Sequence, residues 1–191
     1  MNLSEKVALR LLSNLDPEKA HNLAMRALKF GFIPKTQGFQ AKSLELSVAG
    51  LKFKNPLGLA AGFDKNAEAI KPLLKFGFGF IEVGAVTPLA QTGNPKPRLF
   101  RLKEDNAIIN RFGFNNDGMH EVSKRLSKRP SNGIVGLNLG ANKNSADRIS
   151  DFATVFKACS EFIDFATVNV SSPNTENLRE LQSDKELRKL L

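Results

Sequence analysis

The feature that most constrains this chain is a repeated pairing of an aliphatic run with a helical pattern. Four runs are rich in aliphatic residues and end in, or are directly followed by, Gly, Asn or Ser: 57–62, 80–84, 134–139 and 165–170. Each is followed, before the next begins, by a stretch with helical periodicity: 66–76, 117–128, 147–162 and 183–191. Apolar strands that alternate with helices are typical of a parallel sheet covered by helices. The sequence therefore predicts an α/β fold, as either a doubly wound sheet or half of a (β/α)8 barrel.

The first 40 residues have a different pattern. Residues 3–15 carry apolar side chains at helical spacing, and Asp16 followed by Pro17 is a typical start for a second helix. We predict a domain of two amphipathic helices over 1–40, with a polar linker at about 35–43. Residues 44–53 alternate around Gly50 and predict a β-hairpin. From residue 41 to residue 191 we expect the βα units, in which Pro72 should kink the first helix or delay its start.

Composition limits the partners. The net charge is +9, yet the basic residues are scattered, and without Tyr or Trp no aromatic side chains are interleaved as a base-stacking platform requires. We therefore expect no nucleic-acid partner. The single cysteine, Cys159, excludes an internal disulfide and a multi-cysteine metal site. We expect Cys159 to be a small core residue and predict no metal.

Polar residues gather where the predicted strands end. Small residues and an ammonium group follow the first strand, at 60–65, and further strands lead to amides or hydroxyls at Asn138, Asn169 and Ser172. Parallel strands end at the same edge of a sheet, where such folds place their active sites. Gly, Asn and Ser also favour ordinary turns, which is the alternative reading. A cluster of amides suits a flat heterocycle with C=O and N–H edges, such as a flavin or a pyrimidine.

Four motifs give the chain a family resemblance: 55–66 (NPLGLAAGFDKN), 93–101 (GNPKPRLFR), 110–115 (NRFGFN) and 169–175 (NVSSPNT, followed by Leu178 and Arg179). They closely resemble, in order, the motifs of quinone-dependent dihydroorotate dehydrogenases. The resemblance implies the N-terminal half of a TIM-type barrel that holds FMN. It also implies oxidation of dihydroorotate to orotate in pyrimidine (UMP) biosynthesis, with electrons passed to a membrane quinone. The implied location is peripheral, at the cytoplasmic face of the inner membrane.

The resemblance also assigns roles to individual residues. The implied FMN contacts are Ala61, Gly62, Phe63, Asp64, Lys65, Ala85, Asn138 and Asn169. The implied substrate contacts are Lys65, Asn110, Arg111, Phe112, Gly113, Phe114, Asn169 and Asn174. Ser172 would be the base, with Thr175 as our candidate proton relay, and the quinone head group would lie near His21 and Arg101.

Several of these assignments carry a chemical argument. The soluble class of the family uses cysteine as the base, so Ser172 together with the N-terminal helices indicates the quinone class. Serine is a weak base, which works only if the bound flavin acidifies the substrate and a relay removes the proton. Lys65 offers charge complementarity to a substrate carboxylate. Ala85 stands where the family usually has Thr or Ser, and Ala141 where Lys is common.

Two other functions compete with this one. The chain could belong to another FMN barrel, such as a dihydropyrimidine or dihydrouridine reductase, although those use a cysteine acid. It could also be a non-catalytic flavin- or membrane-binding fragment, because residue 191 comes before a fifth strand. We expect the 191-residue chain alone to be inactive, since half of a barrel leaves strand edges exposed.

Overall fold

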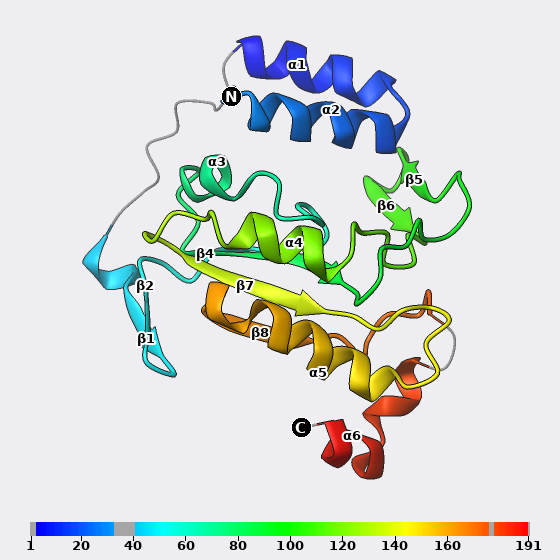
Figure 1. Cartoon of the computed structure of the whole chain (residues 1–191). Coiled ribbons are helices and arrows are strands. Elements are labelled where there is room, and N and C mark those ends of the chain that lie inside the picture. Colours follow the sequence, from blue (N-terminus) through cyan, green and yellow to red (C-terminus); the bar gives the residue numbers. More distant parts are fainter. Residues whose placement is uncertain (1–2, 33–40, 176–177, 191) are drawn as a thin grey trace.

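The computed structural model describes residues 3–32, 41–175 and 178–190, with side chains from residue 6. Its central feature is a four-stranded parallel sheet in the order β3-β4-β7-β8, comprising β3 (Gly58–Leu59), β4 (Phe80–Val86), β7 (Ile134–Leu139) and β8 (Phe165–Val168) (Figure 1). The strands follow chain order in one direction. A doubly wound sheet would reverse that order, so the fold is half of a (β/α)8 barrel.

Helices follow the strands as the sequence predicted, with shorter bounds. They are α3 (Ile70–Leu74), α4 (Met119–Leu126), α5 (Arg148–Cys159) and α6 (Asp184–Leu190), with 3-10 turns at Lys42–Leu44, Ser160–Phe162 and Leu178–Gln182. Pro72 is the third residue of α3. Proline has no N–H to donate, and the first turn of a helix has no acceptor for one, so it is tolerated there. The delayed start predicted from Pro72 is therefore confirmed.

The two faces of the sheet have different neighbours. Alternate residues such as Ile81, Val83 and Val135 are fully or almost fully buried and pack with the apolar sides of α3, α4 and α5 in one core. Cys159 belongs to this core, and burial raises the pKa of its thiol to about 11. The residues between the buried ones in each strand point to the opposite face, because successive side chains of a strand alternate between the two faces. Glu82 and Asn138 belong to this second face.

Phenylalanine rings cover the second face at the end where the strands begin. A Cβ on Gly58 would collide with the Phe80 ring, and one on Gly136 with the Phe165 ring, so each ring lies over the glycine of a neighbouring strand. The rings of Phe80 and Phe165 meet edge to face at 5.8 Å. Such alternation of large and small residues is how barrel interiors are filled.

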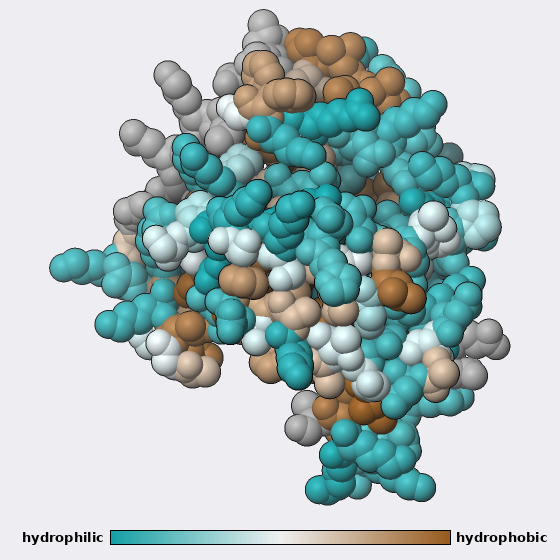
Figure 2. Space-filling view, viewed as in Figure 1, coloured by the Kyte–Doolittle hydropathy of each residue, from teal (hydrophilic) through white to brown (hydrophobic). Residues whose placement is uncertain are grey.

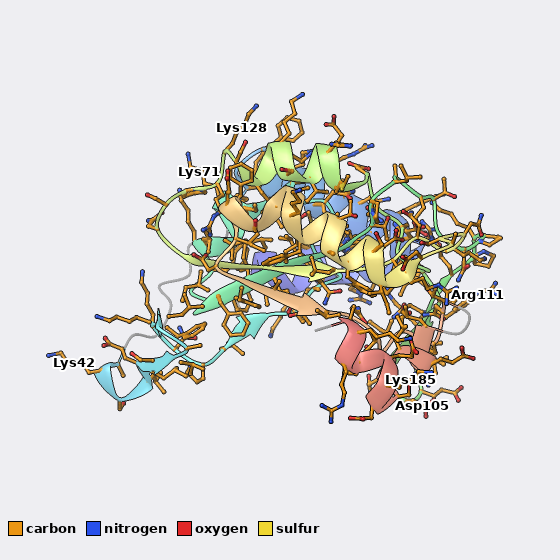
Figure 3. The ribbon with its side chains drawn as sticks, turned by 60° about the horizontal axis from the view of Figure 1, so that its bottom comes forward. Lys42, Lys71, Asp105, Arg111, Lys128 and Lys185 are labelled. Carbon is orange, nitrogen blue, oxygen red and sulfur yellow. The ribbon has the colours of Figure 1, made fainter. Side chains whose placement is uncertain are left out.

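A β-hairpin lies at that same end of the sheet. It comprises β1 (Leu46–Val48) and β2 (Leu51–Phe53), joined by Ala49 and Gly50, which both have positive φ values of 48° and 80°. Two positive φ values are the signature of a tight type I′ hairpin turn, so the hairpin predicted at 44–53 is confirmed. The Phe53 ring contacts Phe80 edge to face at 5.5 Å. Figure 3 shows Lys42, just before the hairpin, at the opposite end of the molecule from Arg111.

Two helices precede the barrel half, α1 (Leu3–Asn14) and α2 (Pro17–Lys29), and the Asp16 carboxylate caps α2 through the Lys19 N–H at 2.9 Å. α2 buries Ala20, Met25 and Leu28. Val7, Leu9 and Leu11 of α1 are exposed, as is Leu15 just after the helix. Figure 2 shows a hydrophobic area over α1. None of the described helices is long and apolar enough to cross a bilayer. Most of the linker expected at 35–43 lies outside the described residues.

A second hairpin, which the sequence analysis did not predict, follows β4. It comprises β5 (Leu99–Leu102) and β6 (Ala107–Asn110), paired antiparallel, and it lies beside the start of α2 in Figure 1. The polar turn between the strands contains Asn106 at φ 49°. This hairpin connects two of the family-like motifs, so it positions the segment that follows it at 110–115.

Candidate active site

A cavity of about 350 Å³ opens at the end of the sheet where the strands finish. Its lining combines backbone at the ends of β3 and β4, amide side chains from β7 and from the loop after β8, and the segment after β6. The lining residues are Ala61, Gly62, Lys65, Gly84, Ala85, Asn110, Phe112, Gly113, Phe114, Asn115, Asn138, Asn169, Ser172 and Asn174. The clustering of polar residues at this edge, predicted from their positions after the strands, is therefore found in the structure.

A chain of hydrogen bonds along the cavity floor runs from β4 through β7 to the loop after β8. Asn138 Nδ2 donates to Glu82 Oε1 at 2.7 Å, and Asn169 Nδ2 donates to Asn138 Oδ1 at 2.9 Å. The Asn169 Oδ1 accepts in turn from the Ser171 backbone and hydroxyl groups. A carboxylate only accepts, so Glu82 determines which way round both amides lie. Glu82 is not among the site residues predicted from the sequence.

The 61–65 loop is held from below by a buried carboxylate. Asp64 is 1% exposed and accepts from the backbone N–H groups of Glu68 and Ala69, both at 2.8 Å. Burial raises the pKa of Asp64, and these hydrogen bonds oppose the rise. The Gly62 N–H donates to Gly84 O at 2.9 Å, which ties the loop to the end of β4. Asp64 thus fixes the loop that carries Lys65.

Lys65 is the cation of the cavity. Its Nζ donates to Gly62 O at 2.7 Å and lies 4.5 Å from the centre of the Phe112 ring. Burial lowers the pKa of the Lys65 ammonium, while the negative charge of Glu18 opposes that change. An ammonium held among amides and an aromatic ring is suited to bind a carboxylate.

The 110–115 segment is held by the loop that precedes β5. Asn94 donates to the Phe112 carbonyl from its backbone and to the Arg111 carbonyl from its side chain, both at 2.9 Å. A Cβ at Gly93 would collide with the Phe112 carbonyl, so only glycine permits this approach. The Arg111 guanidinium donates to Pro97 O and does not line the cavity.

The strand that ends at Val168 leads to the predicted base. Ser172 lines the cavity, and its Oγ accepts from the Asn174 N–H at 3.3 Å. Arg179 Nε donates to the Ser171 carbonyl at 2.9 Å, so the 3-10 turn at Leu178–Gln182 supports this loop. Thr175, the suggested relay, is 3% exposed.

The structure brings most of the predicted site residues to this one cavity. Of the residues predicted to contact FMN or substrate or to move the proton, four do not line it: Phe63, Asp64, Arg111 and Thr175. Asn115 lines the cavity but was not predicted to contact a ligand, and its Oδ1 is buried with no hydrogen-bond partner in the described residues. Ala141 is fully buried in the apolar core.

A second cavity, also of about 350 Å³, lies under α2. His21 is among its lining residues, and the imidazole meets the Phe63 ring edge-on at 5.2 Å. Burial and the Lys65 ammonium lower the pKa of His21. Arg101 does not line this cavity. It donates to the Leu12, Ser13 and Leu15 carbonyls at the end of α1, so of the two predicted quinone residues only His21 lines this cavity.

Comparison with known proteins decides the family. The sequence pattern of the family described as dihydroorotate dehydrogenase matches residues 43–191. The chain belongs to this family. Dihydroorotate dehydrogenase (quinone) from Cereibacter sphaeroides is 57% identical over all of this chain. The corresponding protein from Agrobacterium fabrum is 52% identical over 99% of it. Both of these similar proteins are of the quinone type.

Solved structures agree with this assignment. The dihydroorotate dehydrogenase of Eimeria tenella, crystallised with ferulenol, superposes with a TM-score of 0.88 at 42% identity, covering 96% of this chain and 52% of that one. Its ligand-free form gives 0.86 at 43% identity, covering 92% of this chain and 51% of that one. The half-barrel prediction is confirmed. The chain spans about half the length of its relatives, 54% for the Cereibacter sphaeroides protein and 52% for the Agrobacterium fabrum protein.

Proposed function

We propose that this chain supplies the substrate-facing half of an enzyme that oxidises dihydroorotate to orotate, with FMN as hydride acceptor and a membrane quinone as final acceptor. The observation that carries the proposal is one cavity lined by Lys65, Ser172 and several amides. A cation, a hydroxyl and amide edges are the groups that a planar amide ring with a carboxylate requires.

The residues present fit FMN, which members of this family typically bind. The cavity floor offers oriented amides on Asn138 and Asn169, and Asn115 Oδ1 is a buried acceptor that lacks a partner among the described residues. Space is open beside Gly62, where a Cβ would meet nothing within 4 Å. Backbone at 61–65 and Ala85, with these amides, would hold the ring system. When bound, FMN supplies the hydride acceptor.

The chain's own groups then bind and deprotonate the substrate. Lys65 pairs with the carboxylate, and Asn110, Asn169 and Asn174 hold the ring edges by hydrogen bonds. Ser172 takes the proton from the carbon next to the one that loses hydride, and Thr175 passes that proton on. Because serine is a weak base, its contribution depends on exact placement against the acidified carbon.

The two N-terminal helices form the quinone entrance in this proposal. Exposed apolar side chains on α1, together with Phe30 and Phe32 at 82% and 75% exposure, suit a peripheral contact with the membrane at its cytoplasmic face. The cavity beneath α2, with His21, offers a place for a quinone ring. Deleting residues 1–33 from a full-length protein should abolish turnover with quinone but leave reoxidation by a soluble dye. Unchanged quinone kinetics would contradict the entrance.

Two measurements test the chemistry. A full-length protein should purify with FMN bound, and a folded but colourless preparation would refute the flavin assignment. Ser172→Ala should keep FMN and orotate bound while flavin reduction slows by about 10²–10⁴-fold. Ser171→Ala is the matched control, because the Ser171 hydroxyl bonds to Asn169 and is absent from the cavity lining. Equal losses from the two variants would mean that Ser172 is not the base.

A further inference from the structure

The two cavities share part of their lining. Lys65, Phe112 and Asn115 line both, and we call these three residues the shared wall. Two cations lie close to the Phe112 ring, with Lys65 Nζ at 4.5 Å and Arg98 Cζ at 5.4 Å from its centre. Because protein interiors are closely packed, a shift of either cation should change the position of the Phe112 ring, which belongs to the wall of both cavities.

Arg98 links this wall to α2. Its side chain is 7% exposed and faces Glu18, at 13%, through two bonds: Nε to Oε2 at 3.1 Å and Nη2 to Oε1 at 2.7 Å. Its remaining nitrogen, Nη1, donates to the Thr92 and Asn94 carbonyls. Asn94 in turn donates to the Phe112 carbonyl. A short chain of contacts thus leads from the first turn of α2 to the shared wall.

We propose that Glu18 and Arg98 are a positioning pair: they hold Phe112 and Lys65 in the geometry that binds substrate, and they make that geometry depend on how α2 is seated. The inference rests on the proposed function of the cavity. A planar guanidinium fork on a carboxylate gives fixed geometry that a lysine could not reproduce.

Glu18 and Arg98 also shift the pKa of Lys65, in opposite directions. Burial lowers the pKa of the Lys65 ammonium, Glu18 raises it, and Arg98 lowers it further. Other charged or titratable groups face Lys65 from its own loop, from α2 and across the second cavity: Asp64, His21, Arg26, Lys29 and Glu68. Binding of a carboxylate needs the charged ammonium, so orotate affinity should fall as pH rises through the Lys65 pKa.

The test uses a full-length protein with FMN bound and follows the dissociation constant of orotate by flavin absorbance across pH. Glu18→Gln and Arg98→Gln should each weaken orotate binding about tenfold at neutral pH, because the wall is no longer held. The pH at which binding is lost should move down in Glu18→Gln and up in Arg98→Gln. A purely structural defect would not separate the two variants in this way.

Controls make each outcome decisive. Arg129→Gln breaks an ion pair with Asp164 of comparable geometry, 2.6 and 3.1 Å, away from the cavities, and should leave orotate binding unchanged. Arg98→Lys keeps the positive charge but not the two-pronged guanidinium. It should therefore weaken orotate binding without moving the pH at which binding is lost. If a Gln variant does not fold, Arg98→Lys still tests whether the geometry of the guanidinium positions the shared wall. Unchanged orotate affinity in the Glu18 and Arg98 variants would overturn the proposal. So would a shift, in the same direction in both Gln variants, of the pH at which binding is lost. A wild-type protein without FMN or orotate binding would instead refute the proposed function.

Discussion

Glu82 offers the sharpest test of the cavity floor, because its carboxylate orients two amides at once. The Asn138 Nδ2 donates to Glu82 Oε1 at 2.7 Å, which leaves Asn138 Oδ1 facing Asn169 Nδ2 at 2.9 Å. Glu82→Met removes the acceptor while nearly keeping the size of the side chain. The Asn138 amide can then rotate, and the rotated form places its Nδ2 against the Nδ2 of Asn169. Binding a flavin would first have to restore the original orientation.

The magnitude follows from the lost bond. A hydrogen bond to a charged group contributes about 1.5–3 kcal/mol. This amount is divided between folding stability and the cost of reorienting the amides when FMN binds. Since about 1.4 kcal/mol corresponds to a factor of ten, the dissociation constant of FMN in Glu82→Met should rise by about tenfold, and by no more than about 150-fold.

The assay is titration of the apoprotein of a full-length enzyme with FMN, followed by flavin fluorescence, with urea unfolding as the parallel measurement of stability. Glu82→Gln is the matched control, because its Oε1 can still accept from Asn138, and its FMN affinity should stay within about threefold of wild type. The reasoning fails if Glu82→Met binds FMN like wild type, or if Met and Gln weaken binding equally.

Three further predictions concern the frame around the site. Asp64→Ala removes the acceptor of three backbone N–H groups and should lower the free energy of unfolding by about 1–3 kcal/mol in urea titrations, with Asp64→Asn recovering part of it. Burial would raise the pKa of Asp164, but the hydrogen bonds from Arg129 and the Val135 N–H outweigh burial and lower it. The ionised Asp164 therefore stabilises the fold at neutral pH, and this contribution is lost in acid. The destabilisation caused by Arg129→Gln should therefore shrink as pH falls below 3.8, the ordinary value, and a pH-independent difference would refute this. The 191-residue chain expressed alone should self-associate through the edges of β3 and β8, and a flavin-loaded monomer in light scattering would count against it.

The location of the site could be predicted because parallel strands end together. Asn138 and Asn169 stand where two aliphatic runs finish, and the register places Leu139 of β7 beside Val168 of β8, so the following loops meet. No long-range information is needed for that step. The position of Glu82 carried a signal as well, since it is the single charged residue within β4. Its partner could not be inferred, because the register between β4 and β7 is a property of the folded sheet.

Other features depended on packing that a sequence pattern does not contain. The β5–β6 hairpin leaves Ile108 and Ile109 exposed at 67% and 54%, so its strands lack the alternation of a half-buried sheet. On α2, Leu23 is exposed while Met25 is buried, because contacts with the barrel half decide which side of the helix turns inward. Arg101 donates to the carbonyls at the end of α1, a contact that its place in the sequence did not reveal.

The site therefore consists of two parts that differ in how they are held. The floor, from Glu82 to Asn169, is fixed by strands in register, and its geometry follows from the sheet itself. The shared wall of Lys65, Phe112 and Asn115 is held by loops, and those loops reach α2 through Arg98 and Glu18. Substitutions in the floor should then change affinity at every pH, whereas substitutions at the Glu18–Arg98 pair should also move its pH dependence. This difference follows from where the charges lie, since the floor holds Glu82 among amides and the wall holds the ammonium.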